Sequence, residues 1–374
     1  MSPIDLEAML QGISRWVAIE SPTRETADVN RMIDAVARDV DGTSIAVERI
    51  PGKEGLGDSL ILRAGPQNDR PGILVMSHVD TVHPLGSIAR DLPMRREGDK
   101  FFGPGVYDMK GGAYLALEAF RRVAASGAAT QPLTFLFTPD EEIGSPTTRG
   151  LIEELGAKAS AVLVTEPARD GGKIVTGRKG VGRFDVHVEG RPAHSGSRHE
   201  DGRSAIREAA RQILAIEGMT DYPRGVTTTV GMLAGGTAAN VIPQHARFSV
   251  DLRVVEPLDG EVYKAKILGL KAADPDIRIT VVGDMNRPPY KKTAAVEGLF
   301  LKARAIAAEI GIDLQDVPLT GGGSDGNFTA ALGVPTLDGL GVDGDGAHTL
   351  HEHALVSSIV PRTQLMERLL TSLR

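Results

Sequence analysis

The residues best suited to chemistry are histidines and carboxylates placed where apolar runs end. His78 and Asp80 close the run that begins at Ile73. Residues two apart on a strand point to the same side, so His78 can bind a metal ion through one ring nitrogen while Asp80 holds the other. Taken alone, the pair fits an ordinary solvated strand end equally well.

Three consecutive acids, Asp140, Glu141 and Glu142, follow the apolar run 133–137. Adjacent carboxylates repel one another unless solvent, a helix end or a cation stabilises them. One of them can bind a metal ion while its neighbour acts as a general base. A solvated acidic turn has the same local sequence.

Three further segments supply metal-binding side chains. Asp108 lies between a Gly/Pro turn and a helical pattern, where it could equally cap the helix. Glu166 follows another apolar run, and a late segment contains His348, His351 and His353. The chain has no Cys, so a metal site must use nitrogen and oxygen donors. Such a set suits a catalytic pair of zinc ions rather than structural zinc.

The elements that would position these residues alternate between strand and helix. Apolar runs occur at 59–63, 73–76, 133–137 and 161–164, and helical patterns at 6–17, 25–38, 109–125 and 147–155. This alternation predicts an α/β domain with a mainly parallel central sheet and flanking helices. In an open sheet of that kind, ligands bind beyond the carboxyl ends of the strands.

The pattern changes in the middle of the chain. Alternating strand patterns occur at 181–188, 226–233, 247–254 and 277–282, with helices at 204–216 and 260–273. They predict an inserted α+β domain with a four-stranded sheet covered on one face by two helices. Helical patterns return at 294–310 and from Ser357. We therefore expect a discontinuous α/β domain at 1–179 and 288–374, interrupted by a second domain at 180–287.

Composition excludes several kinds of partner. The 374 residues are 41% apolar and 24% charged, as in soluble globular proteins. The net charge of -7, with no long basic run, argues against nucleic acid or an anionic membrane as a partner. No apolar run is long enough to span a bilayer, and the acidic N-terminus does not match a signal peptide. We therefore expect a cytoplasmic protein, unless an export signal has been removed.

Taken in order, these segments resemble the M20 family of zinc metallopeptidases and deacylases. The matching segments are HVD, GPGVYDMKGG, DEEIGS, TEP, PAHSG, ANVIP, DLRV, GGGSDG and AHTLHE, which extend over essentially the whole chain. The resemblance implies a catalytic domain with two Zn²⁺ per subunit and an inserted lid domain that forms a homodimer. Co²⁺ or Mn²⁺ could occupy the same donors.

The resemblance also implies the ligands of each zinc ion. One ion is held by His78 and Glu166, the other by Glu142 and His348, and Asp108 bridges the two. It further implies a cis peptide bond after Asp108.

The choice of the last ligand rests on spacing. His348 is preferred because the family places a Glu four residues after the ligand, and Glu352 stands there. His351 and His353 stay open as alternatives.

The other catalytic roles follow in the same way. Asp80 is expected to orient His78, and Glu141 to act as the catalytic base. Two zinc ions can share a water molecule and polarise a carbonyl group, while Glu141 moves the proton from the water to the leaving amine. His194, on the lid, is expected to reach the site of the partner subunit and stabilise the oxyanion.

Within the family, the sequence looks closest to the glutamate carboxypeptidases. These release a C-terminal amino acid from small peptidyl, acyl or folate-like substrates. Asn240 and Arg253 match substrate-binding positions, Gly323 belongs to a backbone-lined wall, and Lys173 and Arg287 are candidate cations for the glutamate side chain. Deacylases of acetylornithine or succinyl-diaminopimelate share the metal motifs and remain an alternative.

Two other classes of protein also deserve consideration. Ser324 lies in a G-x-S-x-G segment, and Asp343 and His348 follow in the chain order of a serine hydrolase triad. That interpretation leaves the carboxylates and His78 unexplained. A non-catalytic metal or peptide binder is the other possibility, and the presence of Glu141 argues against it.

Overall fold

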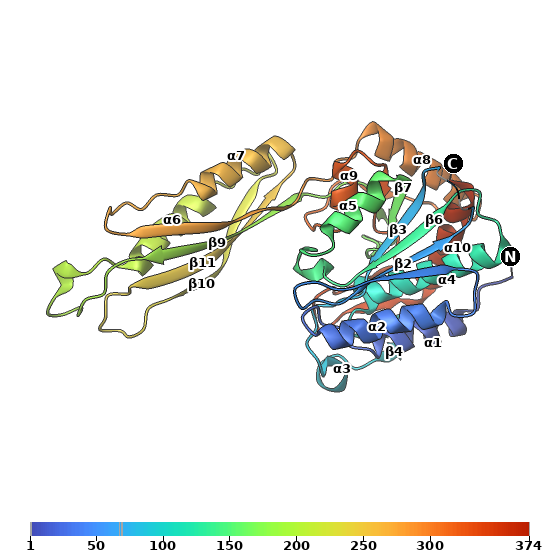
Figure 1. Cartoon of the computed structure of the whole chain (residues 1–374), viewed down its shortest axis with the longest axis horizontal. Helices are drawn as coiled ribbons and strands as arrows, with labels where there is room; N and C mark the ends of the chain where they lie inside the picture. The colour runs from blue at the N-terminus through green and yellow to red at the C-terminus, as the bar shows by residue number, and fades with distance from the viewer. Residues whose placement is uncertain (1, 67, 69, 374) are drawn as a thin grey trace. The chain divides into compact units, whose positions relative to one another are not determined.

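The computed structural model describes residues 2–66, 68 and 70–373, which form two compact units (Figure 1). Unit 1 comprises the chain up to Gly177, Lys291–Thr320 and the residues from Ser324 onward. Unit 2 comprises Arg178–Tyr290 and Gly321–Gly323. Each unit has its own sheet and core.

Unit 1 is built on a mixed six-stranded sheet. Its strands, in spatial order, are β1 (Ala46–Ile50), β2 (Ser59–Ala64), β6 (Leu133–Thr138), β3 (Gly72–His78), β7 (Ala159–Val164) and β14 (Thr336–Leu337). The pairs β6–β3, β3–β7 and β7–β14 are parallel, whereas β1–β2 and β2–β6 are antiparallel. The predicted α/β class with a mainly parallel sheet is confirmed.

Helices cover this sheet on both faces, which is why its central strands are apolar along their whole length. Phe135 packs against Phe120 of α4 with ring centroids 5.8 Å apart. Leu136 points the other way, into a cluster with Ile152 of α5 and Phe328 of α9. The helices of unit 1 are α1 (Leu6–Val17), α2 (Thr26–Asp39), α3 (Ser87–Arg90), α4 (Gly111–Ser126), α5 (Arg149–Ala157), α8 (Ala294–Ala308), α9 (Gly326–Ala331) and α10 (Val356–Ser372).

Two small sheets complete unit 1. One has the order β15 (Gly344–Asp345), β16 (His353–Leu355), β5 (Lys100–Phe102) and β4 (Arg95–Glu97), and the other pairs β13 (Asp316–Val317) with β8 (Ile174–Val175). Short irregular turns lie at η1 (Val106–Lys110) and η2 (Glu141–Ile143). Both turns carry residues that the sequence singles out for chemistry.

Unit 2 is a four-stranded antiparallel sheet with two helices. The strand order is β10 (Thr227–Gly235), β11 (His245–Val254), β9 (Gly180–Glu189) and β12 (Arg278–Arg287), and the helices are α6 (Ala205–Glu217) and α7 (Pro257–Leu268); a short turn, η3 (His199–Asp201), precedes α6. Phe184, Val186 and Val188 alternate with exposed residues and face the core beneath the helices. The predicted α+β architecture is confirmed.

Several boundaries differ from those that the sequence predicts. The helix expected at 260–273 begins at Pro257, a favoured first position, and ends before Gly269. Strand β12 extends past the expected 277–282 to Arg287. Strand β1 was not predicted, because four of its five residues are exposed and it lacks an apolar pattern. Within the described residues, no helix is long and apolar enough to cross a membrane.

Candidate metal centre

Three neighbouring parallel strands end together at one edge of the unit 1 sheet. His78 is the last residue of β3, which lies between β6 and β7. Glu141 and Glu142 lie in the turn that follows β6, and Glu166 comes two residues after β7. The parallel arrangement therefore gathers side chains from positions far apart in the sequence.

Asp108 enters the same region from the turn that precedes α4. Its peptide bond to Met109 is cis, as the resemblance implies. Gly105 has a φ of +71°, and a Cβ atom there would lie 2.5 Å from Cγ2 of Thr81. Only glycine suits this tight approach. Beyond Asp108, the buried Lys110 donates from Nζ to the carbonyl of Ile19 at 2.6 Å.

The five expected ligands lie together, with Asp108 in the middle. His78 Nε2 lies 3.2 Å from Asp108 Oδ1 and 3.8 Å from Glu166 Oε1. His348 Nε2 lies 3.3 Å from Asp108 Oδ2 and 3.2 Å from Glu142 Oε2. Each carboxylate oxygen of Asp108 thus faces a different imidazole. The arrangement has two halves joined by one carboxylate.

The neighbouring carboxylates raise the pKa of both imidazoles. Burial alone lowers the pKa of His78, but hydrogen bonds to Asp108 and Asp80 outweigh it, and the pKa lies well above its usual value. Hydrogen bonds to Asp108 and Glu142 raise the pKa of His348 to about 11. The surrounding negative charge therefore favours a cation at each imidazole.

The carboxylates themselves are perturbed by the same contacts. Burial raises the pKa of Asp108, but hydrogen bonds from His348 and His78 dominate and bring it well below the usual range. Burial raises the pKa of Glu142, against the hydrogen bond from His348. Among the described residues, Glu142 Oε1 is buried without a hydrogen-bond partner. A buried, unpartnered carboxylate oxygen is costly unless a cation binds it, so the residues fit metal ions.

Asp80 lies beneath these residues and organises them. It is fully buried and accepts hydrogen bonds from Thr23 Oγ1 at 2.7 Å and from the backbone N–H groups of Glu141 and Glu142, both at 3.2 Å. His78 Nδ1 lies 2.9 Å from the carbonyl oxygen of Asp80 and 3.4 Å from its carboxylate. The carbonyl is thus the closer acceptor for the imidazole, and the carboxylate mainly holds the acidic turn.

Glu141 lies in a second group of side chains that could hold a metal ion. One side-chain oxygen of Glu141, one of Glu166 and a ring nitrogen of His78 lie within 4.8 Å of one another. Asp140, the first acid of the run, is instead structural, because Thr147 and Thr148 donate to its carboxylate. The three consecutive acids therefore have different surroundings.

The alternative histidines lie elsewhere in unit 1. His353 belongs to β16, where its Nδ1 lies 2.8 Å from the carbonyl of His351 and its ring packs on Phe102. His351 is exposed. In the described part of the chain, neither forms an ion pair with Asp108 or Glu142, as His348 does.

Ser324 has a structural environment that does not fit a nucleophile. It is completely buried, its hydroxyl donates to Asp338 at 2.5 Å, and it accepts from the N–H of Gly326 at 3.1 Å. The next residue, Asp325, accepts from Thr138 Oγ1 at 3.0 Å. The serine hydrolase interpretation is therefore wrong, since His348 faces carboxylates and Ser324 is not presented to a substrate.

Lys173 lies in a turn at the start of β8. Its backbone exchanges two hydrogen bonds with Arg169, at 2.8 and 2.7 Å, and its side chain is half-buried. Arg362, buried on α10, donates to the carbonyl of Gly172 at 2.9 Å and so fixes the turn.

The remaining expected substrate contacts belong to unit 2. His194 and Asn240 are exposed neighbours on two adjoining loops, joined by a hydrogen bond of 3.0 Å from Ser195 N to Asn240 O. The N–H groups of Gly196 and Ser197 point to Nδ1 of His194, at 3.1 and 3.2 Å. The Nδ1 atom is therefore the acceptor, and Nε2 carries the proton.

Arg253 and Arg287, two of the expected substrate contacts, lie beside the glycine segment of unit 2. Arg253 forms two hydrogen bonds to Asp251, at 2.7 and 2.8 Å, and donates to the carbonyl of Gly321 at 3.2 Å. Arg287 is buried, and its Cδ would lie 2.7 Å from a Cβ added to Gly323. Position 323 thus requires glycine.

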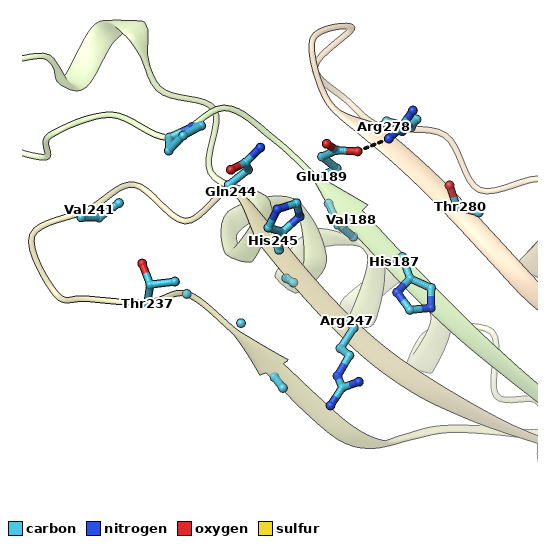
Figure 2. A pocket seen from close by; sticks show the side chains of 15 residues that line it. His187, Val188, Glu189, Thr237, Val241, Gln244, His245, Arg247, Arg278 and Thr280 are labelled. Atoms are coloured by element: carbon cyan, nitrogen blue, oxygen red, sulfur yellow. Dashed lines mark hydrogen bonds and ion pairs between the residues drawn. The ribbon is translucent and has the colours of Figure 1, made fainter.

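A cavity of about 630 Å³ lies on the open face of the unit 2 sheet (Figure 2). Its lining includes His187, His245 and Arg247, while its one carboxylate, Glu189, is paired with Arg278. The cavity is cationic and lacks the carboxylates that a metal centre needs.

Comparison with known proteins identifies the class. The family model described as "Peptidase family M20/M25/M40" matches residues 74–372. This chain therefore belongs to the M20 family of metallohydrolases, of the carboxypeptidase or deacylase type, which has a dinuclear metal site.

Particular relatives cover nearly the whole chain. Carboxypeptidase G2 of Pseudomonas sp. (strain RS-16) is 29% identical over 375 residues, or 98% of this chain and 89% of the relative. Succinyl-diaminopimelate desuccinylase of Delftia acidovorans is 26% identical over 392 residues, or 98% of each chain. The M20 metallo-carboxypeptidase Sso-CP2 of Sulfolobus solfataricus shares the fold, with a TM-score of 0.77, 17% identity and coverage of 98% and 99%.

Sequence reasoning missed residues that support the centre. Thr23 donates a hydrogen bond to Asp80, which lies 57 residues further along the chain, and no local sequence pattern predicts such a contact. His83 and Glu352 contact each other across 269 residues, and only the spacing after His348 drew attention to Glu352.

Proposed function

We propose that this protein hydrolyses an amide bond and releases a C-terminal amino acid, foremost glutamate, from a small peptidyl, acyl or folate-like substrate. The observation that carries the proposal is the grouping of Glu141 with two halves of a ligand set that share Asp108. Such a set can bind metal ions with a further carboxylate beside them, which is what water-activating hydrolysis requires.

We assign the ligands as the resemblance implies. His78 and Glu166 bind one ion, Glu142 and His348 bind the other, and Asp108 lies between them. We infer zinc, because imidazole and carboxylate donors without thiolate suit a catalytic zinc pair, with Co²⁺ or Mn²⁺ as substitutes. When bound, such a pair supplies positive charge that acidifies water and polarises a carbonyl group.

Glu141 is the general base in this proposal. Its backbone N–H is fixed on Asp80 Oδ1, so the side chain starts from a defined position. It takes a proton from the attacking water and returns that proton to the amine that leaves. Asp80 is a positioning residue, because it holds the acidic turn and the ring of His78 together.

Unit 2 provides the substrate contacts and, we propose, the interface of a homodimer. Since Nδ1 of His194 accepts two backbone hydrogen bonds, its Nε2–H is available to stabilise an oxyanion in the site of the partner subunit. Asn240 and Arg253 would bind the substrate, with the guanidinium of Arg253 gripping the free carboxylate. For this, Arg253 must share or exchange its present partner, Asp251.

Glutamate is the side chain we propose because the sequence resembles the glutamate carboxypeptidases, and the similarity to Carboxypeptidase G2 supports a carboxypeptidase. Lys173 and Arg287 are the cations proposed to recognise it. A deacylase acting on an N-acyl amino acid is the second candidate, favoured by the similarity to a succinyl-diaminopimelate desuccinylase over 98% of both chains.

The test is release of free glutamate from N-acyl-, peptidyl- and folate-type glutamate substrates, beside acetylornithine and succinyl-diaminopimelate. It compares zinc-loaded protein, chelated protein and the Glu141→Ala variant. Glutamate release that disappears on chelation and in the variant would support the proposal. Turnover of the deacylase substrates alone would favour the second candidate, and activity that survives chelation would contradict both.

A further inference from the structure

Glu352 is a buried carboxylate with a full set of hydrogen-bond donors. Its side chain is 1% exposed. Oε1 accepts from the N–H groups of Tyr107 and Asp108, both at 2.9 Å. Oε2 accepts from the N–H of Gly105 at 2.9 Å and lies 2.7 Å from Nε2 of His83. With two donors on each oxygen, Glu352 has no capacity left for a metal ion and is not a ligand.

These donors come from the segments that carry two of the proposed ligands, Asp108 and His78, and Glu352 lies on the segment of a third. Glu352 itself lies four residues after His348. Its backbone donors belong to the turn that presents Asp108, and His83 lies five residues after His78. One carboxylate that binds no metal thus ties together both imidazole segments and the carboxylate between them.

The strength of this junction follows from charge and burial. Hydrogen bonds to an ionised acceptor are about twice as strong as neutral ones, and a buried carboxylate tolerates the loss of a donor poorly. The N–H of Asp108 is one of the four donors, so the backbone that carries the Asp108 carboxylate cannot shift without disturbing Glu352. Lys110 holds the far end of the same turn through the carbonyl of Ile19.

We propose that Glu352, together with His83, is a positioning residue that sets the separation of the two halves of the metal centre. This rests on the ligand assignment under the proposed function. Asp108 belongs to both halves. His348 lies on the same segment as Glu352, whereas the ring of His78 is also held at Nδ1 by the carbonyl of Asp80 at 2.9 Å. Loss of the junction therefore weakens binding of one metal ion more than the other.

The nature of Glu352 makes a sharp substitution possible. In Glu352→Gln, an amide NH₂ group replaces one of the two oxygens. This group is itself a donor, so it cannot accept the two hydrogen bonds that the oxygen accepted. His83→Gln keeps a side-chain donor, whereas His83→Phe keeps the bulk and removes it. Glu208→Gln is the matched control: Glu208 is 1% exposed and accepts from Gln212 and the N–H of Ala273 in unit 2.

The experiment titrates full-length, metal-free protein with Co²⁺ followed by visible absorption, and with Zn²⁺ followed by calorimetry. We expect two ions per subunit in the wild-type protein and in Glu208→Gln. Glu352→Gln should bind one of the two about 10- to 100-fold more weakly, the usual effect of losing a hydrogen bond behind a ligand. His83→Phe should weaken the same ion to a smaller extent, and His83→Gln should restore it.

Urea unfolding of the metal-free variants separates positioning from general stability. Suppose that Glu352→Gln binds both ions normally and, like Glu208→Gln, only unfolds at a lower urea concentration. This result would overturn the inference and leave the proposed function intact. If Glu352→Gln does not fold, the test uses His83→Gln and His83→Phe instead. Equal metal affinity in these two variants would overturn the inference. A wild-type protein that binds no second ion would overturn the proposed metal centre and this inference together.

Discussion

The two regions expected to act on substrate are built in opposite ways. In unit 1, His78 and Asp80 are almost fully buried, and hydrogen bonds from Thr23, Glu141 and the backbone hold them. In unit 2, His194 and Asn240 are exposed on loops. The metal-binding side chains are thus preorganised within one unit. The side chains expected to contact substrate remain open to a second molecule.

The difference follows from the two sheets. Parallel strands β6, β3 and β7 end side by side, so the residues that follow them meet at one edge of the sheet. The antiparallel sheet of unit 2 has helices on one face only and leaves the other open (Figure 1). Substitutions in unit 1 should therefore affect metal binding or the chemical step. Substitutions in unit 2 should affect substrate binding or stabilisation of the oxyanion and leave metal affinity unchanged.

The largest effect is expected at Glu141. Glu141→Gln should lower kcat by about 10²- to 10⁴-fold, because the amide cannot take the proton from water, while the number of bound metal ions stays the same. Steady-state kinetics and metal analysis check this. Glu153→Gln, a partly exposed acid on α5 that pairs with Arg149, serves as the control and should leave kcat and metal content unchanged. Loss of a metal ion from Glu141→Gln would show that the residue is a ligand instead.

His194→Ala is expected to come next. It should lower kcat by about 10²- to 10³-fold through loss of an oxyanion donor, with an unchanged Co²⁺ spectrum. His199→Ala removes a nearby exposed histidine of unit 2 and should retain full activity. Mixing inactive His194→Ala with inactive Glu141→Gln should recover activity if subunits exchange in a dimer. No recovery after subunit exchange would refute the partner-subunit role.

Arg253→Lys should have an effect of about tenfold, mainly on KM. Lysine keeps the charge but loses the two-pronged hydrogen bonding that suits a carboxylate. Arg247→Lys, on the same strand and in the cationic cavity, is the matched control. Equal KM changes in both variants would contradict the assignment of Arg253 and would indicate that the substrate carboxylate binds near the cavity of Figure 2.

The smallest effect is expected at Thr23. Thr23→Val removes the hydroxyl that donates to Asp80 at 2.7 Å and should cost about 1–3 kcal/mol of folding stability. Metal affinity should fall only a few-fold, since the backbone donors to Asp80 remain. Urea unfolding measures the first effect and calorimetry the second. A loss of metal binding as large as that expected for Glu352→Gln would show that the acidic turn depends on Thr23 alone.

The sequence was sufficient for the fold class and for the edge of the sheet where His78 and Glu166 lie, because apolar periodicity marks the strands that they follow. Periodicity could not choose among His348, His351 and His353, which lie within six residues of one another. It also missed Thr23, His83 and the role of Glu352. Their contacts join segments from 57 to 269 residues apart, and such pairing depends on tertiary packing.

The most direct test of the account is a zinc titration of metal-free protein with hydrolysis of an N-acyl glutamate followed at each step. The account predicts no hydrolysis without metal and a rise in activity that levels off at two ions per subunit, in the wild type but not in Glu141→Gln. Hydrolysis by the metal-free protein, or full activity with no metal bound in unit 1, would contradict it.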